Sequence, residues 1–411
     1  MPSKTFADLG VSKAVADALT KRKIASPFAV QELVIPDVLA GRDVLVKSPT
    51  GSGKTLAFAI PMAERLEATD PRPSALILAP TRELAAQIVE ESREVCHSRA
   101  LSIAAVYGGV GIQKQERLAQ RAHILVATPG RLLDLLARRS FTLAKVKFLV
   151  LDEADRMLDM GFKPDVTRIV AQTRSTRQTL LFSATLEGEV GRVAAAFTTN
   201  PVRHEHNPPA RKGATVEHRF LRVAHEAKVS ALVAELGESE RGLALVFVRT
   251  KRGADRLVKR LGTLDVHAVA MHGDKTQAQR EKALARFEAG HVDTLVATDV
   301  AARGIDVDDI THVINFDAPE DRDAYVHRTG RTARAGRSGT AVTFVLDDQA
   351  RDIGRIASDL SLDRQFAESG LRYTATPTRP TPARSYGSGS RPARSYGSSR
   401  SGSGGGRSRR G

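Results

Sequence analysis

Short apolar runs alternate with longer segments of helical spacing along most of this 411-residue chain. The runs are three to six residues long and often β-branched, which favours buried strands over helices. They occupy residues 44–46, 75–79, 124–127, 148–151 and 179–182, and then 243–248, 294–297 and 312–316. Such alternation predicts an α/β fold, with mostly parallel sheets covered by helices on both faces.

The alternation stops at residues 207–213, Asn-Pro-Pro-Ala-Arg-Lys-Gly, which is typical of a solvated linker. We therefore predict one α/β domain over residues 1–207, a linker over 208–215 and a second α/β domain over 216–365. Gly, Ser and Arg dominate the end of the chain, where residues 382–388 recur as 392–398. Too few apolar side chains remain there to offset the entropy of ordering, so we predict a disordered basic tail over 366–411.

The net charge of +15 favours a polyanionic partner, and nucleic acid is the most abundant one. Nine of these positive charges are arginines of residues 372–411, a segment without acidic residues. No apolar run approaches the ~20 residues of a membrane span, and Met1–Phe6 has no apolar leader. The single cysteine, Cys96, excludes an internal disulfide. We expect a cytoplasmic protein without a membrane partner.

A glycine-rich loop follows the first apolar run and precedes a helical pattern at residues 56–60. The loop consists of Ser48, Pro49, Thr50, Gly51, Ser52, Gly53, Lys54 and Thr55. Glycines let backbone N–H groups face phosphate oxygens, and the helix N-terminus favours an anion. We expect Lys54 to reach the β- and γ-phosphates of a nucleotide and Thr55 to hold Mg²⁺. The alternative is a glycine-rich turn without a ligand.

Asp152 and Glu153 follow the apolar run at 148–151, at the end of a strand where ligands bind in open α/β sheets. Asp152 is a candidate Mg²⁺ ligand, and Glu153 is a candidate base for the attacking water. A helix cap is the alternative for an acidic run at this position.

Residues 152–155 read Asp-Glu-Ala-Asp, and over residues 6–346 the chain resembles the DEAD-box RNA helicases. The resemblance implies two tandem RecA-like domains that use ATP, Mg²⁺ and RNA. It also implies that Gln31 reads adenine, Phe6 stacks on the base and Asp306 contacts the ribose. The chain departs from the family at Lys23, Phe28 and Ala333, where the family often has glycine, threonine and glycine.

The resemblance assigns contacts with the RNA backbone to residues of both domains. They are Pro80, Thr81, Arg82, Gly109, Thr128, Gly130 and Arg131 in the first domain, and Arg249, Gly273, Arg280, Thr298 and Arg303 in the second. Backbone N–H groups, hydroxyls and arginines can hold sugar-phosphate without reading bases. At Thr81 and Thr128 the alternative is a helix N-cap.

Four residues are assigned by the resemblance to the coupling of nucleotide state with domain closure: Asp155, Ser183, Thr185 and His327. Arg331 and Arg334 match the arginine-finger motif that completes the catalytic set of Lys54, Asp152 and Glu153. Because they are three residues apart, we expect them to share one face of a helical turn.

These motifs predict an ATP-dependent RNA helicase that unwinds short duplexes or remodels RNA–protein complexes. We expect a monomer that binds RNA with little sequence preference, with ribosomal particles or RNA-decay complexes as partners. The basic tail is expected to tether RNA loosely. The alternatives are an RNA chaperone, a translocating helicase acting on DNA, and a GTPase switch.

Overall fold

The computed structural model describes residues 4–49, 51–206, 215–237, 241–302, 305, 307, 309–333 and 337–371. Four candidate site residues lie outside the described residues: Thr50, Arg303, Asp306 and Arg334. The same holds for positions 208–214 of the expected linker and for the expected tail beyond residue 371.

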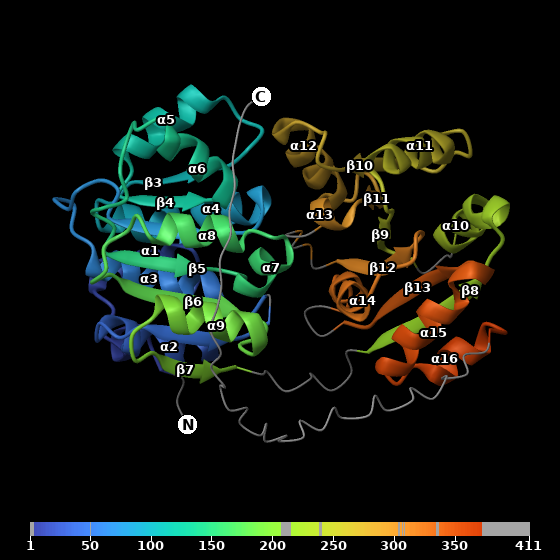
Figure 1. Cartoon of the computed structure of the whole chain (residues 1–411), viewed down its shortest axis with the longest axis horizontal. Coiled ribbons are helices and arrows are strands. Elements are labelled where there is room, and N and C mark those ends of the chain that lie inside the picture. Colours follow the sequence, from blue (N-terminus) through green and yellow to red (C-terminus); the bar gives the residue numbers. More distant parts are fainter. Residues whose placement is uncertain are drawn as a thin grey trace, which may run out of the picture. The chain divides into compact units, whose positions relative to one another are not determined.

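The first sheet contains seven parallel strands in the order β3-β4-β2-β5-β6-β1-β7 (Figure 1). Their bounds are β1 Val44–Lys47, β2 Ala75–Leu78, β3 Ile103–Val106, β4 Ile124–Ala127, β5 Phe148–Leu151, β6 Gln178–Ser183 and β7 Val202–Glu205. The sequence predicts five of these strands. It misses β3 and β7, the two edge strands, because their side chains are only partly buried and give no continuous apolar run.

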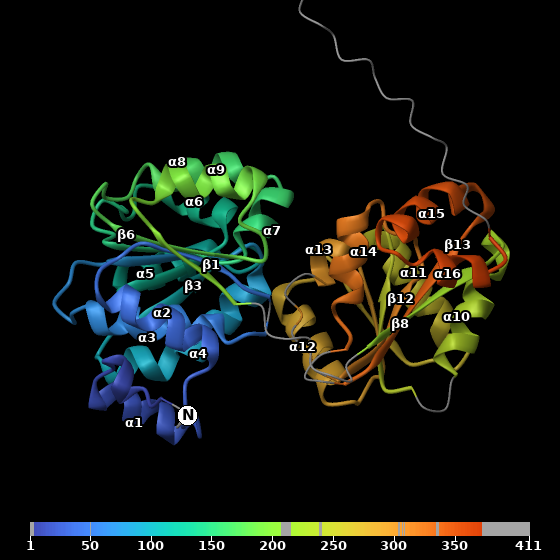
Figure 2. The same ribbon diagram turned by 90° about the horizontal axis from the view of Figure 1, so that it is seen from below.

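Helices cover both faces of this sheet, as predicted. They are η1 Ala7–Leu9, α1 Lys13–Lys21, α2 Ala29–Leu39, α3 Lys54–Arg65, α4 Arg82–Ser98, α5 Ile112–Arg121, α6 Pro129–Ala137, α7 Ala154–Asp159, α8 Lys163–Val170 and α9 Gly188–Phe197. Figure 2 shows α2, α3 and α4 on one face, and α6, α8 and α9 on the other. Alternate side chains of each strand feed two separate cores, as with Ile77 on one face and Leu76 on the other.

The second sheet has six parallel strands in the order β10-β11-β9-β12-β13-β8. They are β8 Val216–Arg222, β9 Leu243–Phe247, β10 Ala268–Met271, β11 Thr294–Ala297, β12 Ile310–Asn315 and β13 Gly339–Val345. Its helices are η2 His225–Ala227, α10 Lys228–Leu236, α11 Lys251–Gly262, α12 Gln277–Glu288, α13 Asp299–Ala302, α14 Arg322–Thr329, η3 Asp347–Gln349, α15 Ala350–Asp359 and α16 Asp363–Glu368.

The second domain extends further than the sequence predicts. The expected boundary at residue 365 falls inside α16, and Phe366 and Leu371 are buried in one core with Phe220 and Tyr325. Residues 366–371 therefore belong to the packed domain and not to the tail. The sequence pattern misses them because two turns of helix are too short to show a clear period.

Among the described residues, no helix is both long and apolar enough to cross a membrane.

Candidate active site

The phosphate loop connects β1 with α3, as its sequence context predicts. Gly51 and Gly53 have φ angles of +78° and +88°, a conformation that favours glycine. The Ser48 N–H donates to the Ser183 carbonyl at 2.9 Å, which ties the loop to β6. Lys54 is buried, and its Nζ donates to the Ser48 carbonyl oxygen at 3.3 Å. The loop thus curls around an ammonium group that can meet a phosphate.

Asp152 lies at the carboxyl end of β5 and is 2% exposed. The Glu153 N–H donates to its Oδ1 at 3.0 Å. Burial raises the pKa of Asp152 to about 6, although Lys54 opposes this shift. A buried carboxylate beside the phosphate loop has the chemistry of a Mg²⁺ ligand. Among the described residues, no group of three or more His, Cys, Asp or Glu side chains could hold a metal ion.

Glu153 forms an ion pair with Arg156, whose Nη1 lies 2.9 Å from Glu153 Oε2. Burial alone would raise the pKa of Glu153, but Arg156 and Lys54 outweigh it and hold the pKa below its ordinary value of 4.5. Glu153 therefore remains ionised at neutral pH, as a general base must. Arg156 is not among the predicted site residues, and its signal in the sequence is its position three residues after Glu153 at the start of α7.

A cavity of about 320 Å³ adjoins the phosphate loop and contains Gln31. The Gln31 Oε1 accepts a hydrogen bond from the Phe28 N–H at 3.0 Å, and its Nε2 donates to the Gly53 carbonyl at 3.0 Å. One N–H and one lone pair of the amide remain for a ligand, enough to read one edge of a base.

Phe6 does not line this cavity. It is 4% exposed and packs in the core with Leu9, at the start of η1. Its contact with the base stays a prediction. The aromatic side chain that does line the cavity is Phe28, which is 60% exposed.

Asp155 and Ser183 link the acidic motif to the end of β6. The Ser183 Oγ accepts from the Asp155 N–H at 3.2 Å. In return, the Asp155 Oδ2 accepts from the N–H groups of Ala184 at 2.9 Å and Thr185 at 3.2 Å. The structure therefore brings three of the predicted coupling residues together.

The RNA-contact candidates of the first domain follow β2, β3 and β4 at the same edge of the sheet. The Arg82 guanidinium lies against Gly109, where an added Cβ would stand 2.4 Å from its Nη1. Thr81 caps α4, since its Oγ1 accepts from the Leu84 N–H at 3.3 Å. Thr128 precedes α6 without a side-chain capping bond. Arg131 donates to the Val110 carbonyl at 2.9 Å.

The two remaining candidates of the first domain have no side-chain polar group. Pro80 follows β2, and Gly130 lies in the first turn of α6.

In the second domain, Arg249, Gly273 and Thr298 follow β9, β10 and β11 at the carboxyl edge of that sheet. Arg249 is exposed. Arg280 on α12 is 5% exposed, and its Nη2 lies 2.9 Å from Glu83 Oε2. In this structure Arg280 is therefore paired with a carboxylate, and its contact with RNA stays a prediction.

Arg331 lies just beyond helix α14, which ends at Thr329, and its N–H donates to the Arg328 carbonyl at 3.1 Å. Because Arg334 lies outside the described residues, its shared face with Arg331 stays a prediction. The Arg331 Nη1 donates to the Ile305 carbonyl at 2.9 Å and its Nε to the His327 carbonyl at 3.3 Å. Ala333 has a φ angle of +56°, in the left-handed region that favours glycine. The side chain of His327 is exposed on α14.

Two parallel sheets flanked by helices, the first with a phosphate loop and an acidic pair, define a nucleoside triphosphatase with tandem RecA-like domains. Residues 28–193 match the DEAD/DEAH box helicase family, and residues 227–336 match the helicase conserved C-terminal domain. The chain belongs to the DEAD-box family of ATP-dependent RNA helicases.

Individual relatives agree with this assignment. The DEAD-box ATP-dependent RNA helicase CshA of Bacillus licheniformis is 42% identical over 342 residues, which cover 83% of this chain and 70% of the relative. CshA of Bacillus subtilis is 41% identical over 342 residues, 83% of this chain and 69% of the relative. The structure of S. cerevisiae Dbp5 bound to RNA and ADP BeF3 has a TM-score of 0.77 at 30% identity, covering 90% of this chain and 95% of the Dbp5 chain.

Proposed function

We propose that this protein hydrolyses ATP in response to RNA and uses the cycle to open short RNA duplexes or remodel RNA–protein complexes. The proposal rests on one edge of the first sheet, where the nucleotide site and the RNA-contact candidates follow neighbouring strands. The phosphate loop, Asp152 and Ser183 follow β1, β5 and β6, whereas the RNA-contact candidates follow β2, β3 and β4. Since β5 and β2 are neighbours, the two ligands would lie beside each other.

The nucleotide half of the edge supplies the chemistry. Lys54 neutralises the phosphates, and Gln31 selects adenine. Thr55 and Asp152 hold Mg²⁺, which would stabilise negative charge on the phosphate oxygens. Glu153 orients the attacking water and accepts its proton, because Arg156 keeps its carboxylate ionised. Arg331 and Arg334 are the proposed arginine fingers, which stabilise transition-state charge in related chemistry.

The RNA-contact candidates of both domains hold the sugar-phosphate backbone of the RNA strand. Arg82, Arg131 and Arg249 offer guanidinium groups, and Thr128 and Thr298 offer hydroxyls. Pro80, Thr81, Gly109, Gly130, Gly273, Arg280 and Arg303 complete the proposed contacts, and Asp306 would contact the ribose. Binding of this kind carries no sequence information, so we propose little preference among RNAs.

Coupling between the two halves rests on Asp155, which bonds to the backbone directly after β6. A shift of the acidic motif on hydrolysis would be passed to Ala184 and Thr185. We propose that ATP and RNA together favour a closed arrangement of the two domains and that hydrolysis releases it, with His327 taking part from the second domain.

The direct test is hydrolysis and strand separation by the full chain. We expect ATPase activity that single-stranded RNA stimulates and DNA of the same sequence does not. We also expect ATP-dependent separation of a short RNA duplex, with little activity when GTP replaces ATP or when EDTA removes Mg²⁺. Equal stimulation by DNA would instead indicate the translocating class of helicase.

We propose a cytoplasmic monomer that works on ribosomal particles or RNA-decay complexes, with the arginines of residues 372–411 as a loose tether for RNA. Deletion of residues 372–411 should weaken RNA binding at low salt and leave duplex separation measurable. Unchanged RNA affinity at low salt would contradict the tether.

A further inference from the structure

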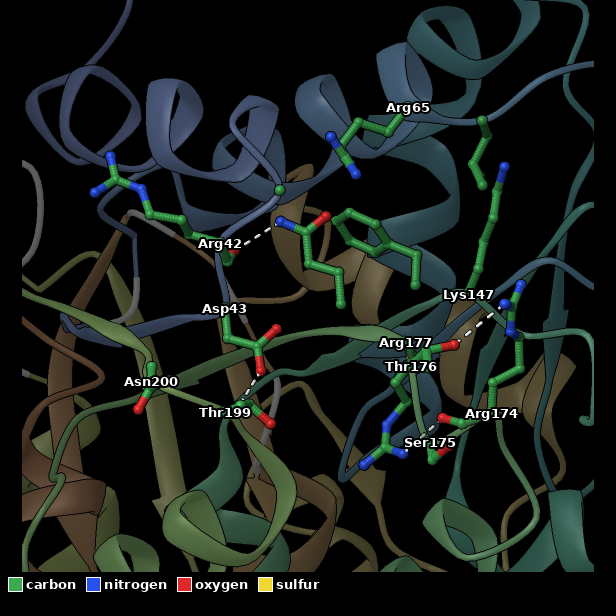
Figure 3. Close-up of a pocket in the computed structure, with 14 residues that line it drawn as sticks. Arg42, Asp43, Arg65, Lys147, Arg174, Ser175, Thr176, Arg177, Thr199 and Asn200 are labelled. Carbon is green, nitrogen blue, oxygen red and sulfur yellow. Dashed lines mark hydrogen bonds between the residues drawn. The ribbon is translucent and has the colours of Figure 1, made fainter.

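A cavity of about 870 Å³ lies at the edge of the first sheet opposite the phosphate loop. It is formed at the amino ends of β1, β5, β6 and β7 and at the end of α3 (Figure 3). These segments are far apart in the sequence, and their convergence makes a hollow of the size that small ligands occupy, about 300–1,000 Å³. Neither ATP nor RNA is assigned to this edge of the sheet.

The cavity is strongly basic. Five cations line it: Arg42, Arg65, Lys147, Arg174 and Arg177. The one carboxylate in the lining, Asp43, is engaged by the backbone: its Oδ1 accepts from the Thr179 N–H and its Oδ2 from the Thr199 N–H, both at 2.7 Å. Both oxygens of Asp43 thus accept hydrogen bonds from the backbone. Because five cations face one carboxylate, the lining keeps an excess of positive charge.

Two of the cations have acidic partners and three do not. Arg42 pairs with Asp37, and the Lys147 Nζ lies 2.7 Å from Asp70. By contrast, the three arginines Arg65, Arg174 and Arg177 donate only to neutral oxygens of the described residues. These guanidinium groups hold a charge that no carboxylate of the described residues neutralises within ion-pair distance.

Arg177 shows the strongest sign of an unmet partner. Its Nε is buried without a hydrogen-bond partner among the described residues. Burial lowers the pKa of Arg177, with Asp43 opposing the shift. A guanidinium donor without a partner favours a nearby anion that can accept from it.

We propose that this cavity binds a small anion with two or more phosphate groups, at a site separate from the ATP site. Guanidinium groups bind phosphate oxygens through two parallel hydrogen bonds, and several converging arginines favour a multivalent anion. A duplex RNA backbone needs an extended exposed track, whereas these residues line one cavity. The concave shape therefore favours the small ligand over RNA.

The two sites share elements without sharing residues. Helix α3 begins at Lys54 in the phosphate loop and ends at Arg65 in the cavity, roughly 16 Å away along the helix axis. Occupancy of one site therefore does not block the other, and the new site can be titrated while ADP fills the phosphate loop.

The test uses inorganic tripolyphosphate, titrated calorimetrically into the full chain with saturating Mg²⁺ and ADP at constant salt. We expect one saturable site per chain. Arg174→Glu should weaken this binding at least tenfold, because it replaces a cation of the cavity with an anion. Since Arg174 is exposed, this substitution leaves the core intact. Arg138→Glu is the matched control. It makes the same charge change at an exposed position after α6 that does not line the cavity, and it should bind like the parent chain.

Three outcomes would overturn the proposal. The first is no saturable binding to the ADP-saturated parent chain. The second is equal weakening by Arg174→Glu and Arg138→Glu, which would reveal general charge attraction only. The third is loss of affinity for a short RNA duplex on Arg174→Glu without any tripolyphosphate site, which would make this face an RNA contact. RNA-stimulated ATP hydrolysis of Arg174→Glu should match the parent chain and tests the proposed function separately.

Discussion

Arg156 Nη1 lies 2.9 Å from Glu153 Oε2, and the side chains of both residues are only 8% exposed. Glu153 itself has a left-handed φ angle of +51°, which turns the acidic motif into α7 and presents the carboxylate to Arg156. The pair fixes the position of the proposed base and also its protonation state.

Glu153→Gln should leave ATP and RNA binding intact and lower the turnover of ATP by ~10²–10⁴-fold, the usual contribution of a positioned base. Single-turnover hydrolysis with RNA present measures the effect. Glu90→Gln, at an exposed position on α4, is the matched control and should hydrolyse ATP normally. Near-normal hydrolysis by Glu153→Gln would remove Glu153 from its role.

Arg156→Met should shift the acid limb of the pH–rate profile to higher pH. Among the groups that lower the pKa of Glu153, Arg156 has the largest effect, so without it the pKa of Glu153 rises. In the parent chain the pair stabilises the fold at neutral pH, and this stabilisation is lost as pH falls through the lowered pKa of Glu153.

Breaking the buried pair with Arg156→Met should lower the free energy of unfolding by about 3–5 kcal/mol, measured by urea unfolding. The double variant with Glu153→Gln should recover much of that loss, since no unpaired carboxylate remains. A double variant as unstable as Arg156→Met would show that Arg156 acts by packing alone.

Gln31→Ala should reduce the preference for ATP over GTP roughly tenfold, since the hydrogen bonds of one amide contribute ~1–2 kcal/mol. Competition of both nucleotides against a fluorescent ADP would measure it. Gln113→Ala, an exposed glutamine of α5, should keep the parent preference. An unchanged preference in Gln31→Ala would place base selection elsewhere in the cavity.

Ala333→Gly should stabilise the second domain by about 1 kcal/mol, because alanine is strained at a φ angle of +56° and glycine is not. The midpoint temperatures of thermal unfolding of the parent chain and of Ala333→Gly measure this difference. Ala289→Gly is the contrasting control. This exposed residue ends α12 with a φ angle of −75°, and glycine there should destabilise the domain slightly. Equal effects of the two changes would mean that the left-handed angle at Ala333 carries no strain.

Cys96 should resist alkylation in the folded protein and react only on unfolding. It is fully buried, and burial raises the pKa of its thiol to about 12, so the reactive thiolate is scarce near pH 8. Iodoacetamide labelling followed by mass spectrometry along a urea series would track the transition. Glu94→Cys on the same helix places a thiol at an exposed position and should label at once. Stoichiometric labelling of native Cys96 would contradict its burial.

The sequence predicts those parts of the fold whose signal is local. Strands β2, β4 and β5 are buried along their whole length, so their apolar runs are continuous. The edge strands β8 and β10 are missed because they are only partly buried. The spacing of Arg331 and Arg334 suggests a helical turn, but α14 ends at Thr329, before both arginines. The burial of Phe6 depends on tertiary packing. The basic cavity could not be predicted from the sequence, since its arginines come from segments far apart in the chain and none belongs to a motif.

The pairing of β1 has a consequence for how the protein is made. Val44 pairs with Leu180 on one side and with Val202 on the other, so the strand before the phosphate loop lies between the last two strands of its domain. Such distant pairings form late, because a long chain segment must first be closed into a loop. During synthesis, the first third of the domain must wait until residues near 205 leave the ribosome. The phosphate loop is therefore among the last features of its domain to be fixed, and a chain cut short before β7 would be unable to hold ATP.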